Sequence, residues 1–117
     1  MASPRPNKNT GTIAFLPHGI QVISATSTAI TLGKERIFLT YAGATAITLA
    51  APTNPDMDGF IMHIVSEVAQ AHVITATNLI NGDNDTLTWG GAVGDSCTLI
   101  ARGGEWFTMQ LTNVTVG

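Results

Sequence analysis

The residues best suited to chemistry in this chain are three histidines and one cysteine. His63 and His72 fall on adjacent predicted strands and come close if those strands pair, whereas His18 follows Pro17 in a predicted turn. A zinc site at the histidines needs a further ligand, and Cys97 is the one thiol in the sequence. We expect hydrogen-bonded or solvated histidines here and no metal.

A second candidate is the acidic segment that begins at Asn54. Asn54, Asp56 and Asp58 place oxygen atoms at alternate positions before Gly59, which imitates the first half of a calcium-binding loop. The twelfth position is Val65 where such a loop needs a bidentate Glu, and a strand is predicted where a helix should follow. We interpret the segment as an ordinary acidic turn and predict no cofactor.

Nucleophilic catalysis has no support in the sequence. The serines lack the glycine pattern of a nucleophile elbow, and no Ser, His and Asp follow a recognised order. We predict that the chain is not an enzyme and has no catalytic residues.

Sugar recognition would need exposed aromatic rings, and aromatic residues make up 6% of the chain. Trp89, Trp106 and Tyr41 are the candidates. Buried indole rings are common in a small core, so we predict that both tryptophans pack inside.

The composition favours assembly and argues against nucleic acid. Charged residues are 11% of the chain, against about 25% in ordinary soluble domains, while there are 17 Thr and 14 Ala. Such a surface has little charge repulsion between copies, so we expect a homo-oligomer. The formal charge of −3 and the lack of a basic stripe indicate no nucleic-acid partner.

The basic residues are unevenly placed. Among the first 36 residues Glu35 is the single acid, and the cations there are Arg5, Lys8, Lys34 and Arg36. These four residues are the candidates for binding an acidic partner or a neighbouring copy. The alternative is a solvated region without a binding role.

No apolar run approaches the ~20 residues that span a bilayer, and no hydrophobic signal segment is recognised. We therefore expect no membrane partner and a protein made and used without secretion. With one cysteine, an intrachain disulfide is excluded.

The elements that must position these residues are short strands. Residues 1–11 hold Pro4 and Pro6 and little to bury, which predicts an extended N-terminal arm before a β-rich domain at 12–117. The pentapeptide Thr-Ala-Ile-Thr-Leu occurs at Thr28–Leu32 and again at Thr45–Leu49, with the alternation of a half-buried strand.

Further strands are predicted from alternation and from the turn residues between them. Phe60–Val65 is apolar on both faces apart from His63, which predicts a central strand covered on both sides, and Asn81-Gly82 predicts a type I′ hairpin turn. The other predicted strands are Thr12–Leu16, Ile20–Ser24, Arg36–Tyr41, Ala71–Asn78, Thr86–Trp89, Ser96–Ala101 and Trp106–Leu111. The sequence thus predicts an all-β single domain, an antiparallel β-sandwich, jelly roll or barrel of about nine or ten short strands.

The part of the chain from Ala44 to Gly117, about two-thirds of its length, resembles small β-rich virion proteins of tailed bacteriophages, namely capsid decoration (cement) proteins and related fibre modules. The residues that carry the resemblance are Thr48–Thr53, Asp58-Gly59 leading into Phe60–Ser66, Ala71–Ala76, Gly94–Ala101 and Gly103–Phe107.

The resemblance implies a structural virion protein that is made in the host cytoplasm and binds the outside of an assembled phage head. Its partners would be the major capsid protein and two further copies in a homotrimer. In such a protein the N-terminal arm would help to hold the shell, with Arg5 and Lys8 facing capsid carboxylates. The alternative is a receptor- or carbohydrate-binding module of a head or tail fibre.

Overall fold

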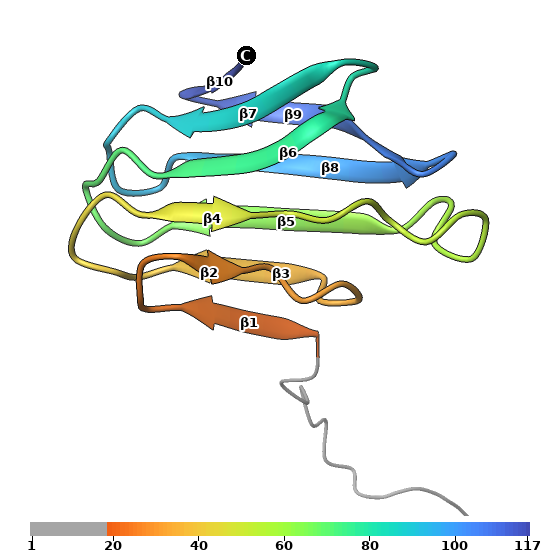
Figure 1. Cartoon of the computed structure of the whole chain (residues 1–117). Coiled ribbons are helices and arrows are strands. Elements are labelled where there is room, and N and C mark those ends of the chain that lie inside the picture. Colours follow the sequence, from red (N-terminus) through yellow and green to blue (C-terminus); the bar gives the residue numbers. More distant parts are fainter. Residues whose placement is uncertain (1–18) are drawn as a thin grey trace, which may run out of the picture.

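The protein is an all-β domain. The computed structural model describes residues 19–117, which form ten strands in one continuous, nearly closed barrel-like sheet (Figure 1). The predicted fold class and number of strands are therefore confirmed. The predicted arm at 1–11, with Arg5 and Lys8, and the predicted strand Thr12–Leu16 lie outside the described residues.

The first six strands form three stacked turns of chain, which we call rungs. Each rung places one strand in each of two facing walls, as the stacked arrows of Figure 1 show. The rungs are β1 (Ile20–Ile23) with β2 (Thr28–Ala29), β3 (Arg36–Leu39) with β4 (Ala46–Thr48), and β5 (Ile61–Ser66) with β6 (Val73–Ile80).

Strands of successive rungs pair in parallel, which corrects the prediction of an antiparallel sheet. β1 pairs with β3 and β3 with β5 in one wall, and β2 pairs with β4 and β4 with β6 in the other. Each connection crosses to the opposite wall, so neighbouring strands run the same way. Side-chain alternation is the same in both kinds of ladder, which is why the sequence pattern could not separate them.

The duplicated pentapeptide lies in two neighbouring strands of one wall. Thr28 is the register partner of Ile47, so the two copies pair two residues out of step. The pairing continues past β2, because the Ile30 N–H donates to the Thr48 carbonyl at 2.9 Å. Both copies then turn Ile and Leu toward the core, where Ile30, Ile47 and Leu49 are buried.

The remaining four strands close the barrel in mainly antiparallel fashion. β7 (Asn84–Trp89) follows β6 through a turn in which Asn81 has φ 51° and Gly82 φ 104°, the positive values that the predicted type I′ turn requires. Ile80 is the register partner of Asn84, so the loop has three residues and is one residue longer than the two-residue loop of a type I′ hairpin. β8 (Ser96–Arg102) pairs with β5, β9 (Glu105–Thr112) pairs with β8, and β10 (Val114–Val116) pairs with β7. A single parallel contact, Ile80 with Trp106, joins the walls at this end.

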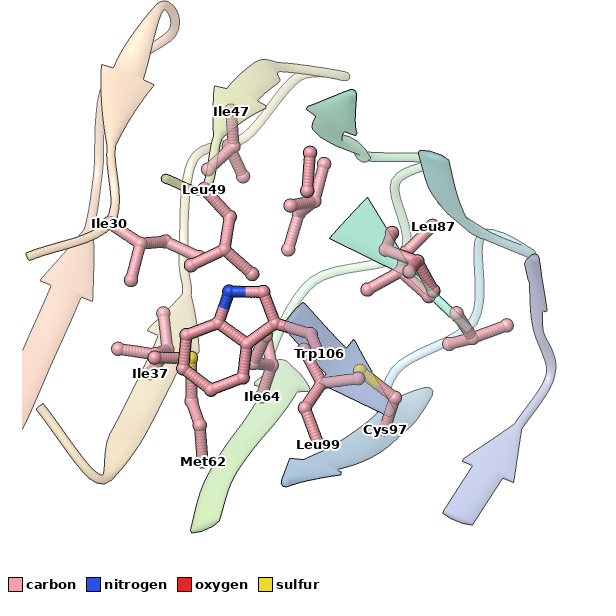
Figure 2. Packing of buried hydrophobic residues seen from close by; sticks show 14 of the residues in the cluster. Ile30, Ile37, Ile47, Leu49, Met62, Ile64, Leu87, Cys97, Leu99 and Trp106 are labelled. Carbon is pink, nitrogen blue, oxygen red and sulfur yellow. The ribbon is translucent and has the colours of Figure 1, made fainter. Parts of the chain in front are cut away.

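The core fills the space between the walls. The Trp106 ring lies among Ile30, Ile37, Met62 and Ile64 (Figure 2) and donates its Nε1–H to the Ala50 carbonyl at 2.9 Å. The predicted burial of both tryptophans is confirmed, since Trp89 is 1% and Trp106 0% exposed. Each indole therefore contributes apolar burial together with a satisfied N–H.

The prediction that Phe60–Val65 is covered on both faces is wrong. In β5, Met62 and Ile64 are fully buried, whereas His63 is exposed and Ile61 is 37% exposed. Within the described residues the walls form a single layer around the core, so each strand has one face inward and one outward.

Among the described residues, no helix is long and apolar enough to cross a membrane.

Candidate interaction face

The outer surface of one wall forms the candidate site, which we call the outward face. It consists of the outward-pointing side chains of β1, β3, β5, β8 and β9, which the registers align in rows across the wall. The rows are Ile20–Arg36–His63–Thr98–Gln110, Val22–Phe38–Val65–Ser96–Thr112 and Ile61–Ile100–Phe107.

Two of these rows leave apolar surface uncovered. Val22 is 56% exposed, and Ile61 and Phe107 are each 37% exposed. Phe38 and Val65 are half-buried in the same row as Val22. Scattered apolar residues on a surface are ordinary, but apolar residues aligned on adjacent strands form a contiguous strip. One such strip lies on each side of the Arg36–His63–Thr98–Gln110 row, and exposed apolar strips are typical of an interaction site.

A β-bulge places another large apolar side chain at the edge of this face. The register between β8 and β9 shifts so that Thr98 faces Gln110 while Leu99 faces Thr108. Met109 is the extra residue between these pairs and is 56% exposed. Bulges re-aim side chains at functional edges, and a flexible thioether suits an adaptable contact.

The middle row holds a chain of hydrogen bonds across three strands. The Thr98 hydroxyl donates to Gln110 Oε1 at 3.1 Å and lies 3.1 Å from His63 Nδ1. Gln110 Nε2 in turn donates to the Ser96 hydroxyl and the Thr112 hydroxyl. Polar side chains on the face are thereby held in fixed positions between the apolar rows.

This chain of bonds sets the proton position on His63. Because the one hydroxyl hydrogen of Thr98 is engaged with Gln110, the hydroxyl oxygen must accept from His63, so Nδ1 carries a hydrogen. In the neutral imidazole, Nε2 is then left as an acceptor on the outward face. His63 also sits opposite Arg36 in the register of β3 and β5.

An open pocket of about 370 Å³ lies where β3 and β5 begin. It is lined by Glu35, Arg36, Gly59, Phe60, Ile61 and His63. The Arg36 guanidinium lies 3.7 Å from the Glu35 carboxylate, and both side chains are more than half exposed. An exposed pair at this distance contributes little stability, so most Arg36 donors remain available to a partner.

The structure places one of the four predicted binding residues, Arg36, at this pocket. Lys34 lies two residues earlier, in the turn between β2 and β3, where its N–H donates to the Thr31 carbonyl, and it is not part of the lining. Sequence reasoning missed Glu35, Phe60 and the role of His63 here. These residues come together because β3 pairs with β5. The sequence gives no sign of this pairing, since Arg36 and His63 are 27 residues apart.

Of the residues considered for metal binding, those within the described part of the chain do not converge, and His18 lies outside it. His63 points outward from β5, Cys97 is buried on the inner side of β8, and His72 is buried in the loop before β6. Among residues 19–117 no group of three or more His, Cys, Asp or Glu side chains is placed to hold a metal ion. Asp58, from the calcium-like segment, accepts the Gly103 N–H at 2.9 Å and faces Arg102.

Away from the outward face, a buried polar cluster links two loops. Asp95, which is 4% exposed, accepts the Ala92 N–H at 2.8 Å and the Asn113 side-chain N–H at 3.0 Å, and its carbonyl accepts the Trp89 indole N–H at 2.9 Å. The Gly90 N–H donates to the Asn113 carbonyl. Every group named here has a partner inside the chain, so the cluster is structural.

His72 is the buried group without such partners. It is 0% exposed, and neither ring nitrogen has a hydrogen-bond partner within the described residues. Burial lowers the pKa of His72, so the ring is kept neutral. The nearby Thr45, whose carbonyl accepts the Val73 N–H, also has an unpartnered buried hydroxyl.

Comparison with known proteins adds no relative. No protein family, no curated protein and no solved structure matches this chain. The outward face and the resemblance in the sequence are therefore the two observations that bear on function.

Proposed function

We propose that the chain is a structural virion protein, a capsid decoration protein that binds the outside of an assembled phage head through its outward face. The observation that carries this proposal is the set of exposed apolar side chains around a fixed polar row: Val22 in one flanking row, Ile61 and Phe107 in the other, and Met109 at the β-bulge. The low content of charged residues and the resemblance in the second half of the sequence support the same role.

The size of the face supports binding by several copies together. Five strands spaced ~4.8 Å apart and ~20 Å long present roughly 500 Å² of sheet, whereas a stable interface takes about 800 Å² from each partner. One outward face alone is therefore small for tight binding. Three linked copies, each with a basic arm, would raise the affinity through effective concentration.

A direct test uses heads that lack the protein. Wild-type chain and a Val22→Lys/Met109→Lys variant are mixed with such heads, and bound protein is measured after sedimentation. We expect the variant to bind about tenfold more weakly or worse, because each lysine puts a charge into a dehydrated contact. Val93→Lys is the matched control, since Val93 is 68% exposed in the loop between β7 and β8.

Two results would contradict the proposal. If the wild-type chain does not sediment with heads, the decoration role is wrong. If the double variant binds as well as Val93→Lys, heads are bound through another surface. The homotrimer is tested separately by native mass spectrometry, where the expected mass is three times the 12.2 kDa of one chain.

The second candidate function is a receptor- or carbohydrate-binding module of a fibre, and the pocket at Arg36 is the observation that favours it. A guanidinium, a carboxylate and the half-buried Phe60 ring can together bind a polar ring with an apolar face. The tryptophans do not serve this role, because both are buried. Glycan-array signal that is lost on Arg36→Ala and kept on Arg102→Ala would establish this function instead.

A further inference from the structure

The two free sheet edges at the β1–β2 end of the barrel differ in one respect. On β2, the outward backbone groups are already engaged, because the Gln21 side chain donates to the Ala29 carbonyl at 3.0 Å and accepts the Thr31 N–H at 2.8 Å. On β1, the corresponding edge meets none of the described residues.

The direction of the β1 backbone groups follows from its bonds to β3. The carbonyls of Gly19 and Ile23 accept the N–H groups of Arg36 and Thr40, each at 2.9 Å. Since backbone groups alternate in direction along a strand, the N–H and C=O of Ile20 and Val22 face the free edge. An edge with such a row of unpaired donors and acceptors is a template for one more strand.

We propose that this edge of β1 is the docking site for residues 12–16 of the same chain, paired antiparallel to β1. The connection is Pro17-His18-Gly19, and Gly19 has φ 81°. A three-residue hairpin loop is built from a type I turn followed by a left-handed residue, for which Pro first and Gly last are the favoured types. The loop length and the Gly19 conformation therefore both suit a hairpin.

The resulting register gives every side chain of the segment a suitable position. Leu16 stands opposite Ile20 and Ala14 opposite Val22, so the outward face gains a sixth strand. Ile13 and Phe15 then fall on the inner side beside Gln21 and Ile23, where they cover the open end of the core. The segment is apolar enough to compensate for its ordering.

The docked strand would also determine where the N-terminal arm leaves the domain. The pairing of the strand with β1 does not depend on the proposed function, but the role of the arm in binding a partner does. Residues 1–11 would leave from the Ser24 end of β1. The Arg36 pocket lies at the opposite end of β3, so the arm and the pocket would contact a partner at two separate places.

The test is amide hydrogen exchange by NMR on the isolated full-length chain. We expect the amide of Val22, which would donate to the Ala14 carbonyl, to be protected like those of Gln21 and Ile23, which face β3. In Ile13→Asp/Phe15→Asp the exchange of the Val22 amide should rise at least about tenfold, because the docked strand is lost. Asn7→Asp/Asn9→Asp adds the same two charges at the same spacing and should leave the protection unchanged.

Two outcomes would overturn the proposal. Fast exchange of the Val22 amide in the wild-type chain, with Gln21 and Ile23 still protected, would mean that the edge is unoccupied. Protection that disappears on dilution, together with a change in native mass, would mean that a second copy occupies the edge. Neither readout involves phage heads, so failure here is distinct from failure of the decoration role.

Discussion

The side-chain amide of Gln21 hydrogen-bonds the backbone N–H of Thr31 across the open end of the barrel, at 2.8 Å, and also the Ala29 carbonyl. A residue in a parallel strand bonds the same two kinds of group, a carbonyl and the N–H two residues later. Gln21 thus occupies the edge of β2 as a neighbouring strand would. Blocking a free edge in this way is a defence against edge-to-edge association.

We therefore predict that Gln21→Ala lowers the free energy of unfolding by about 1–2 kcal/mol, the value of two partly exposed hydrogen bonds. Urea denaturation followed by tryptophan fluorescence measures this change. Light scattering should also show more self-association, because the β2 edge is freed. Gln70→Ala is the control, since its side chain makes a 3.5 Å contact in an exposed loop, and equal midpoints for the two variants would contradict the interpretation.

Alternation and turn residues made the strands predictable, and the same signals could not give their arrangement. The type I′ turn at Asn81-Gly82 and the inward positions of Ile37 and Leu39 follow from local sequence alone. Which strands pair depends on whether the connection between them stays in one wall or crosses to the other. The link from Thr48 to Ile61 is a loop whose path local sequence does not encode.

The candidate site was only partly predictable for the same reason. Arg36 was singled out from its charge, but the pocket around it exists because β3 pairs with β5 and brings His63 beside it. The exposed side of β5 was mistaken for a covered one, because Ile61 and Val65 read as core residues in an apolar run. The outward face of β5 carries apolar side chains where polar ones usually stand, so the residue pattern alone could not distinguish this exposed face from a covered one.

The close approach of Gly90 to Asn113 predicts a large steric effect. A methyl group at Gly90 would overlap the Asn113 side-chain amide, so Gly90→Ala should lower the free energy of unfolding by about 1–3 kcal/mol. Asn113 has φ 53°, which glycine also adopts easily. In a double-mutant cycle, Gly90→Ala combined with Asn113→Gly should cost less than the sum of the single changes. Strict additivity in urea denaturation would show that the overlap is relieved elsewhere.

The buried, unpartnered His72 predicts a loss of stability in acid. Its pKa is lowered in the folded state, so below the ordinary value of 6.5 the unfolded chain binds a proton that the folded chain excludes. The free energy of unfolding should therefore fall as the pH drops below 6.5, by at most about 1.4 kcal/mol per pH unit, until the folded-state pKa is reached. Above pH 6.5 the contribution of the neutral His72 ring to the free energy of unfolding is fully present.

The measurement is urea denaturation between pH 7.5 and about pH 4.5, a range chosen to bracket the ordinary histidine pKa. His72→Leu should flatten the slope below pH 6.5. Gln70→Ala removes no titratable group and should retain the slope. An unchanged slope in His72→Leu would assign the acid sensitivity to other groups.

Burial of Cys97 predicts an inert thiol and an alkaline limit to stability. Burial raises the pKa of Cys97 from 9.0 to about 12, so between these values the unfolded chain loses a proton that the folded chain keeps. The stability that the buried neutral thiol adds to the folded state is therefore fully present below pH 9, and it is lost as the pH rises toward 12. A thiol reagent at pH 8 should modify Cys97 only after urea is added. Rapid modification of the native chain would contradict the burial, and Cys97→Ala gives the blank.

The hydrogen-bond chain on the outward face predicts one tautomer of His63. Thr98 uses its hydroxyl hydrogen for Gln110, so neutral His63 should carry its proton on Nδ1 and leave Nε2 as an acceptor. Ring ¹⁵N shifts measured at high pH distinguish the two nitrogens. Thr98→Val removes the acceptor and should shift His63 toward the Nε2–H tautomer that free imidazole side chains favour. Thr112→Val is the control, because Thr112 contacts Gln110 at the end of the hydrogen-bond chain farthest from His63, and it should change the ratio of tautomers less. An Nε2–H tautomer in the wild-type protein would mean that the Thr98 hydroxyl donates to His63, and the acceptor that we place beside Arg36 would then be absent.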